Sequence, residues 1–179
     1  MEIFKIAVTG NVGAGKTTFI RTISETKVVD TERRATDETS LLKENTTVAF
    51  DFGRITLNPE QVLYMYGTPG QSRFDFMWEI VINQVEAYVL LVAAHRPEDF
   101  RGARRILTFI NQRVQIPMII GLTHTDCEGA WQKEDIILAL GFSANKECPP
   151  VVQVNPENPG SVAQSLVVLL EELMSVSVV

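Results

Sequence analysis

The chain has 179 residues, a length that suits one domain and is cramped for two. Apolar and aromatic residues make up 45% of it, which is enough for one buried core and excludes a disordered or collagen-like chain. Sixteen lysine and arginine residues against 22 acidic ones give a net charge of −6. This acidic balance argues against general binding to nucleic acid or to an anionic membrane.

Cysteine content and the chain ends bear on the compartment. Cys127 and Cys148 have no metal-ligand spacing, and we predict that both are reduced thiols. Uncharged stretches such as 158–170 fall short of the roughly 18 apolar residues of a membrane span. The N-terminus lacks the layout of a signal peptide, and neither end carries a lipidation motif. We therefore expect a cytoplasmic protein without direct membrane insertion.

Short apolar runs alternate with helical patterns along the chain, which predicts an α/β fold in three layers. The predicted strands are residues 3–9, 47–57, 61–66, 87–93, 118–122 and 151–154. The turn at 58–60 is too short for a crossover helix, so the second and third strands are expected to form an antiparallel hairpin. The other connections are long enough for parallel strands. We therefore expect a six-stranded, mostly parallel sheet flanked by helices.

Three helices are predicted from residues spaced at the helical period. The first carries an apolar stripe between Ala103 and Val114, and the second runs from about residue 130 to 140 and ends at Gly141. The third has Asn158 as its N-cap, Pro159 in its first turn and an apolar stripe from Val162 to Leu173. Residues 28–45 are polar without a sustained period, which is typical of a functional loop.

A glycine-rich loop at 10–17, Gly-Asn-Val-Gly-Ala-Gly-Lys-Thr, directly follows the first strand and opens a helix. Glycines let backbone N–H groups close around phosphates, and the helix start adds partial positive charge. A plain structural turn would not need the Lys-Thr ending, whose lysine reaches phosphates and whose hydroxyl can bind Mg²⁺. The predicted phosphate-binding residues are Gly10, Asn11, Val12, Gly13, Ala14, Gly15, Lys16, Thr17 and Thr18.

Three further segments, 47–51, 67–71 and 123–126, resemble switch I, switch II and the guanine-recognition segment of Ras-like small GTPases in order and spacing. The blocks at 46–55 and 66–74 are similar to the bacterial and archaeal MglA-like group. This resemblance spans about residues 3–173 and is most specific at 6–18 and 46–78. It implies a P-loop NTPase fold of the Ras-like kind, a single small-GTPase domain over 1–179, and Mg²⁺ with GTP or GDP as ligands.

The resemblance also implies roles for single residues. Thr47 matches the switch I threonine, which closes on Mg²⁺ and the γ-phosphate, and the N–H of Gly70 would meet that phosphate. Gln71 matches the glutamine that orients the attacking water. Asp126 matches the carboxylate that accepts two hydrogen bonds from guanine, a donor pattern that adenine lacks. The implied catalytic residues are Gln71 and Lys16, and the implied metal ligands are Thr17 and Thr47.

The switch II segment departs from the family pattern at one position. Gly67 stands where many members have an aspartate that holds Mg²⁺ through water. Mg²⁺ must then rely on Thr17, Thr47, phosphates and waters, or on another acid, for which Asp51 is one guess.

The base-recognition segments depart from the pattern as well. Thr123 keeps a hydroxyl that can tie neighbouring loops together, whereas His124 replaces a lysine and can stack on the purine instead. Asn155 and Pro156 stand near the expected Ser-Ala-Lys loop, where a proline has no N–H to donate to the guanine oxygen. Guanine specificity is therefore less firmly predicted than triphosphate binding.

Several alternatives stay open. The favoured hypothesis is a slow GTP-hydrolysing switch, and the others are a degenerate nucleotide-binding scaffold, an ATP-binding P-loop protein and, more weakly, a kinase. Arginines that could assist hydrolysis are Arg33, Arg34, Arg54 and Arg73. The resemblance implies protein regulators or effectors, namely a Roadblock-type partner and a sensor kinase. We also expect a monomer and, from the acidic charge balance, no binding to nucleic acid.

Two other residues received structural interpretations. We predict that Trp78 packs the helix after switch II onto the sheet, and that His95 is a surface residue without a partner.

Overall fold

The computed structural model describes residues 1–27, 51–70, 75–143 and 147–177, and for residues 75–77 it describes the backbone only. Its strands are β1 (Glu2–Gly10), β2 (Asp51–Asn58), β3 (Gln61–Gly67), β4 (Ala87–Ala93), β5 (Met118–Thr123) and β6 (Val151–Gln153). Its helices are α1 (Lys16–Ile23), α3 (Asp75–Ile82), the short 3₁₀ helix η2 (Pro97–Asp99), α4 (Phe100–Asn111), α5 (Lys133–Ala139) and α6 (Pro159–Ser177).

The six strands form one sheet in the order β2-β3-β1-β4-β5-β6. Only the β2–β3 pair is antiparallel, so the predicted hairpin and the mostly parallel sheet are confirmed. The second strand was predicted from residue 47, and its residues 47–50 lie outside the described residues. Val154, predicted to end the last strand, follows β6, yet its N–H still donates to Leu122 O at 2.9 Å.

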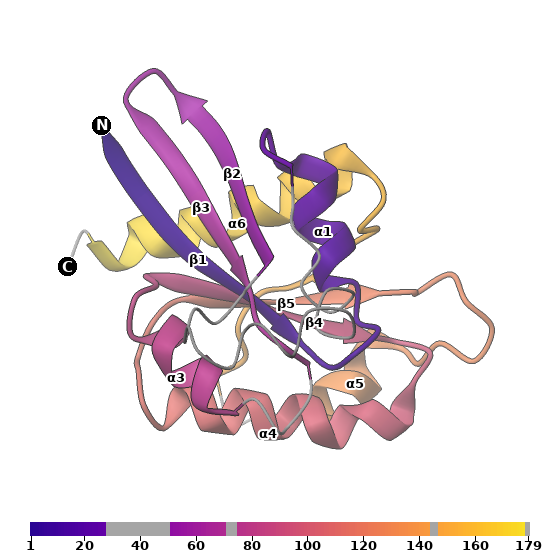
Figure 1. The fold of residues 1–179 in the computed structure, drawn as a ribbon. Helices are drawn as coiled ribbons and strands as arrows, with labels where there is room; N and C mark the ends of the chain where they lie inside the picture. The colour runs from indigo at the N-terminus through magenta and orange to yellow at the C-terminus, as the bar shows by residue number, and fades with distance from the viewer. Residues whose placement is uncertain (28–50, 71–74, 144–146, 178–179) are drawn as a thin grey trace, which may run out of the picture.

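Helices cover both faces of the sheet (Figure 1), with α1 and α6 on one face and α3, α4 and α5 on the other. Strand β4 is buried along its whole length. Its Tyr88, Leu90 and Val92 belong to the core beneath α3, α4 and α5, while Val89 and Leu91 belong to the core beneath α1 and α6. Burial on both faces explains why the central strands read as continuous apolar runs.

The predicted stripe is confirmed on α4, where Ala103, Ile106, Leu107 and Ile110 are buried. Its last residue, Val114, lies beyond the end of the helix and is half-buried against the same core. Helix α6 begins as predicted, since the Asn158 side-chain oxygen accepts a hydrogen bond from the Ser161 N–H at 2.9 Å. Gly141 adopts the left-handed conformation that ends α5.

The start of α5 was predicted about three residues too early. The Trp131 N–H donates to Ala94 O and the Ala130 N–H to Cys127 O, so this backbone is held in a loop against β4. The helix therefore begins at Lys133.

Trp78 packs as predicted, being 3% exposed within the core under α3 and α4. Its indole N–H donates to Pro69 O at 2.8 Å, and its ring meets the Phe109 ring edge-on at 5.5 Å between centroids. The bond to Pro69 also holds the segment that leads into Gly70.

Among the described residues, α6 is the one helix long and apolar enough to cross a membrane by length and composition alone. Its buried residues Val162, Leu166 and Leu169 pack in the core beneath the sheet, while Val167, Met174 and Val176 are exposed. The absence of direct membrane insertion stays a prediction.

Candidate nucleotide-binding site

The glycine-rich loop connects β1 to α1 at the carboxyl edge of the sheet, the edge at which α/β proteins bind ligands. Gly13 and Gly15 have φ angles of +82° and +102°, a conformation that residues with a side chain rarely adopt. An ideal Cβ on Gly15 would lie 2.9 Å from Pro156 Cγ, so this glycine also lets a distant loop pack close. The strand, loop and helix context predicted for phosphate binding is therefore present.

Lys16 is the first residue of α1 and is only 6% exposed. Its Nζ donates to Gly10 O and Asn11 O, both at 2.8 Å, which holds the ammonium inside the loop. Gly70 passes directly over this arrangement, because an ideal Cβ on it would lie 2.8 Å from Lys16 Nζ and 2.4 Å from Val12 N. The segment after β3 thus meets the loop where phosphates are expected.

Thr17 faces a carboxylate from the neighbouring strand. Its hydroxyl donates to Asp51 Oδ2 at 2.5 Å, and Asp51 is 7% exposed. Asp51 pairs across the hairpin with Gly67, and an ideal Cβ on Gly67 would lie 2.9 Å from Asp51 Cβ. The glycine that replaces the family aspartate therefore leaves room for a carboxylate delivered from β2.

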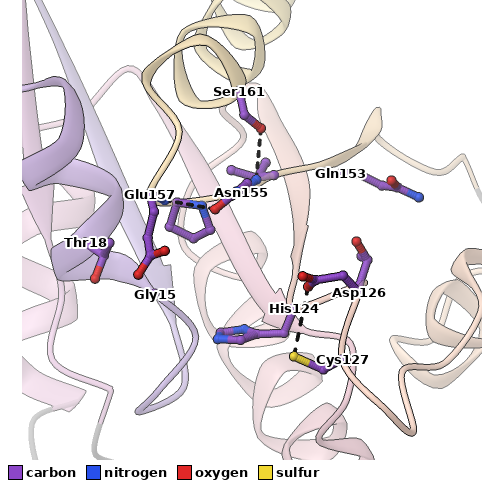
Figure 2. A pocket seen from close by; sticks show the side chains of 12 residues that line it. Gly15, Thr18, His124, Asp126, Cys127, Gln153, Asn155, Glu157 and Ser161 are labelled. Atoms are coloured by element: carbon purple, nitrogen blue, oxygen red, sulfur yellow. Dashed lines mark hydrogen bonds between the residues drawn. The ribbon is translucent and has the colours of Figure 1, made fainter.

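The base-recognition segment follows β5 and is tied to the loop. The buried Thr123 hydroxyl donates to Ala14 O at 2.9 Å, which is the loop-tying bond expected of it. Next to it lies a pocket of about 600 Å³ (Figure 2), in which Asp126 and His124 lie across from Thr18 and Glu157. The residues lining this pocket are Gly15, Thr18, His124, Thr125, Asp126, Cys127, Gln153, Val154, Asn155, Pro156, Glu157 and Ser161.

The loop at 155–157 forms the opposite wall, and its backbone donors are already committed (Figure 2). The Asn155 N–H donates to Ser161 Oγ at 2.9 Å, and the Glu157 N–H donates to Asn155 Oδ1 at 3.1 Å. Pro156 has no N–H to offer. None of these three residues therefore presents a free backbone donor to a purine oxygen in this conformation.

His95 is not the unpartnered surface residue that we expected. It is half-buried, and its ring lies 4.6 Å from the His124 ring between centroids. The carboxyl ends of β4 and β5 are neighbours in the sheet, so residues 29 positions apart meet there. The pairing arises from the parallel register, which the local sequence does not reveal.

His124 has a strained backbone and a defined ring tautomer. Among the described residues it is the only one other than glycine with a left-handed φ, at +56°. Its Nδ1 lies 3.0 Å from Thr123 Oγ1, whose hydroxyl proton is already donated to Ala14. Nδ1 is therefore the donor in this pair, which leaves Nε2 as the acceptor of a neutral ring. Burial, and secondarily the neighbouring His95, lower the pKa of His124.

This lowered pKa predicts an acid-sensitive fold. The neutral ring is favoured in the native state, so its stability contribution is complete above the unfolded-state pKa near 6.5 and is lost as the pH falls through the lower folded value. We expect the parent protein to lose more stability than His124→Asn between pH 7.5 and pH 5. Urea unfolding midpoints of the nucleotide-free proteins test this, and parallel curves for the two proteins would refute it. Asparagine tolerates the left-handed backbone at position 124, so backbone strain should not differ much between the variant and the parent.

Five of the predicted site residues and candidate arginines cannot be placed in the structure. Thr47, Gln71, Arg33, Arg34 and Arg73 lie outside the described residues, so their roles stay predictions.

Arg54 lies on β2, where its backbone bonds to Ser24 and Glu25 beyond the end of α1. Arg96, which our sequence reasoning passed over, instead lies beside Gly13. A signal for it existed, because it follows β4 at the carboxyl edge of the parallel sheet.

The fold and the loop define a P-loop nucleotide-binding protein with the fold of small GTPases. The structure is similar to that of the Arl6 (BBS3) small GTPase from Trypanosoma brucei, solved with the bound nucleotide analogue GppNp, at a TM-score of 0.71. The match covers 97% of this chain and 98% of that chain at 14% identity. At this identity the likeness shows the fold alone, and it confirms the predicted α/β architecture.

A family model described as "Conserved hypothetical ATP binding protein" matches residues 26–179, and the chain belongs to that family. The matched range begins after the glycine-rich loop. The chain is also 27% identical over 92 residues to the uncharacterized protein MJ1339 of Methanocaldococcus jannaschii. That match spans 51% of this chain and 52% of the relative, about half of each. The narrower resemblance to the MglA-like group stays a prediction.

Proposed function

We propose that the protein binds GTP with Mg²⁺ through its P-loop and hydrolyses it slowly, as a molecular switch. The observation that carries this proposal is one continuous site at the carboxyl edge of the sheet. Lys16 lies within the loop, the Thr17–Asp51 pair lies at one side, and Asp126 lies in a pocket on the other. A charged triphosphate, a divalent cation and a purine need these three kinds of groups, side by side.

The oxygen donors of the Thr17–Asp51 pair fit Mg²⁺. Mg²⁺ prefers oxygen ligands, keeps several waters, and is held by few protein groups together with phosphates. Among the described residues no cluster of three His, Cys, Asp or Glu side chains could hold a metal, so a site of the all-protein kind is absent there. A bound Mg²⁺ would neutralise phosphate charge, with the Thr17 hydroxyl as a ligand and Asp51 placed to accept from its waters.

Asp126 supports guanine as the base. Its carboxylate lines the pocket, and a carboxylate there accepts two hydrogen bonds from the N–H groups on the guanine edge. Adenine offers no such pair of neighbouring donors on that edge, so binding it would leave acceptors of the pocket unpaired.

ATP is the second candidate, because one observation favours it specifically. The 155–157 loop presents no free backbone donor to a guanine oxygen, whereas the adenine amino group needs an acceptor rather than a donor. The carboxylate of Glu157 lines the pocket and could accept from that amino group. The family description, which names ATP binding, is consistent with this candidate.

Pro156→Ala separates the two bases. The substitution restores one backbone N–H beside the pocket, and we expect GDP to bind up to about tenfold more tightly while ADP affinity stays unchanged. Titration calorimetry with Mg²⁺ measures both, and Pro150→Ala serves as a control outside the pocket. Tighter binding of ADP than of GDP by the parent, with no gain for GDP in the variant, would favour the ATP candidate.

Hydrolysis is proposed through Gln71, which would orient the attacking water. We expect Gln71→Leu to slow single-turnover release of phosphate by about tenfold or more, because leucine cannot hydrogen-bond water. Nucleotide affinity should change little, which separates a catalytic from a binding defect. Equal rates for parent and variant would instead favour the scaffold hypothesis, in which bound nucleotide orders the switch loops and is barely hydrolysed.

The proposed function extends to the partners and the location of the protein. We propose a cytoplasmic, monomeric domain spanning 1–179 that interacts with protein regulators or effectors. A Roadblock-type partner and a sensor kinase are supported only by the resemblance of the 46–55 and 66–74 blocks to the MglA-like group.

A further inference from the structure

Arg96 places a second cation against the P-loop. It follows β4 at the carboxyl edge of the sheet, and an ideal Cβ on Gly13 would lie 3.1 Å from its Nη1. The contact therefore depends on a glycine at position 13, where any side chain would press on the guanidinium. The Arg96 side chain is 42% exposed, so part of it is accessible to a ligand from solvent.

Neighbouring acids orient this guanidinium. Arg96 Nε lies 3.0 Å from Asp99 Oδ2 and 3.5 Å from Glu98 Oε1, both within the η2 turn. The pairing with Asp99 on the Nε side leaves Nη1 against the loop. A guanidinium is a planar fork whose separate edges can serve an acid and a phosphate at once.

The η2 turn also contacts the glycine-rich loop at Asn11. Asn11 Nδ2 donates to the backbone oxygen of Asp99, and an ideal Cβ on Gly102 would lie 2.9 Å from both Asn11 Nδ2 and Oδ1. Asp99 binds Arg96 through its side chain and Asn11 through its backbone oxygen, so it fixes the position of the arginine relative to the loop. The position of Arg96 beside the loop is therefore not that of a loosely attached surface side chain.

Resting on the proposed function, we propose that Arg96 is a nucleotide-binding residue that contacts the phosphates common to the di- and triphosphate and slows nucleotide release. Its Nη1 lies beside Gly13, one of the loop residues whose backbone amides would cradle these phosphates. In a chain of net charge −6, Arg96 brings a guanidinium beside Gly13, where an anionic ligand is expected, although Glu98 and Asp99 offset part of its charge. Because GDP and ADP carry the same phosphates, we expect the effect of Arg96 on release to be the same for either purine.

Release of fluorescently labelled diphosphate from Arg96→Gln tests this inference. With Mg²⁺ present, we expect dissociation about tenfold faster than from the parent, and a partial rescue by Arg96→Lys, which keeps the charge and loses the fork. The loss of affinity should be larger for the diphosphate than for the monophosphate and should shrink at high salt. Arg101→Gln, an exposed arginine on α4, is the matched control and should release nucleotide at the parent rate.

The outcomes separate this inference from the proposed function. If the parent binds neither labelled GDP nor labelled ADP, the proposed function fails. If the parent binds one of them and Arg96→Gln releases it at the parent rate, the role of Arg96 fails and the function stands. A variant that loses monophosphate and diphosphate affinity equally, and unfolds at a lower temperature without nucleotide, would show Arg96 to be structural and overturn the inference.

Discussion

Replacing Lys16 with methionine is expected to weaken nucleotide binding by at least about a hundredfold and to leave no measurable hydrolysis. Lys16 Nζ is held inside the loop by Gly10 O and Asn11 O, so its charge is delivered to a fixed place beside Gly70. Methionine keeps much of the apolar stem and removes the charge together with its three donors. Calorimetric titration with GTP and Mg²⁺ measures the loss.

The control for this substitution is Lys27→Met, which removes the same charge at an exposed position beyond α1. We expect its nucleotide affinity to match that of the parent. Unfolding midpoints of both variants without nucleotide show whether the loss belongs to the site or to the fold. Binding of GTP by a folded Lys16→Met variant at the parent affinity would contradict the placement of the phosphates in this loop.

Removing the charge of Asp51 is expected to make nucleotide retention depend far more on Mg²⁺ concentration. Asp51 accepts from the Thr17 hydroxyl and lies on the strand paired with Gly67, in the space that a side chain at 67 would need. Mutating a group that hydrogen-bonds to the ligands of a metal ion typically weakens metal binding by about 10- to 100-fold. For Asp51→Asn we therefore expect the Mg²⁺ concentration that half-suppresses GDP release to rise at least about tenfold.

Moving the carboxylate across the hairpin is the sharper version of this experiment. Gly67→Asp alone would force a Cβ to 2.9 Å from Asp51 Cβ, so we expect it to destabilise the fold. Combining it with Asp51→Gly clears that space, and Ile20 Cδ1, also 2.9 Å from the new Cβ, is the end of a flexible side chain. We expect the swapped protein to recover much of the Mg²⁺ dependence of the parent. Parent-like Mg²⁺ dependence in Asp51→Asn would refute a role of this carboxylate in metal binding.

Local patterns predicted most of the fold, and long-range pairing accounts for what they missed. The apolar run of β4 and the stripe of α4 depend on burial, which a period in the sequence reports directly. Helix α5 begins later than predicted because the hydrogen bond from the Trp131 N–H to Ala94 O overrides a helical pattern. No local signal reports such a contact between distant segments.

In the candidate site, too, contiguous residues could be predicted, whereas contacts between distant segments could not. The glycine-rich loop is contiguous, so its spacing alone predicted it. The role of Asp51 near the metal site could only be guessed from the sequence, because Asp51 lies opposite Gly67 only through the register of the β2–β3 hairpin. The His95–His124 pair and the approach of Arg96 to Gly13 likewise depend on loops that parallel strands bring to one edge. The sequence could not show that the backbone N–H groups of Asn155 and Glu157 are already hydrogen-bonded, because their acceptors are the Ser161 hydroxyl and the Asn155 side chain.

The identity of the nucleotide retained through purification tests the central claim most directly. Protein purified in Mg²⁺ is heat-denatured, and the released nucleotide is separated by ion-exchange chromatography, with Lys16→Met treated in parallel as the empty reference. We predict GDP or GTP at close to one molecule per chain from the parent and none from the variant. Release of adenine nucleotide alone, or of the same nucleotide from both proteins, would contradict the account.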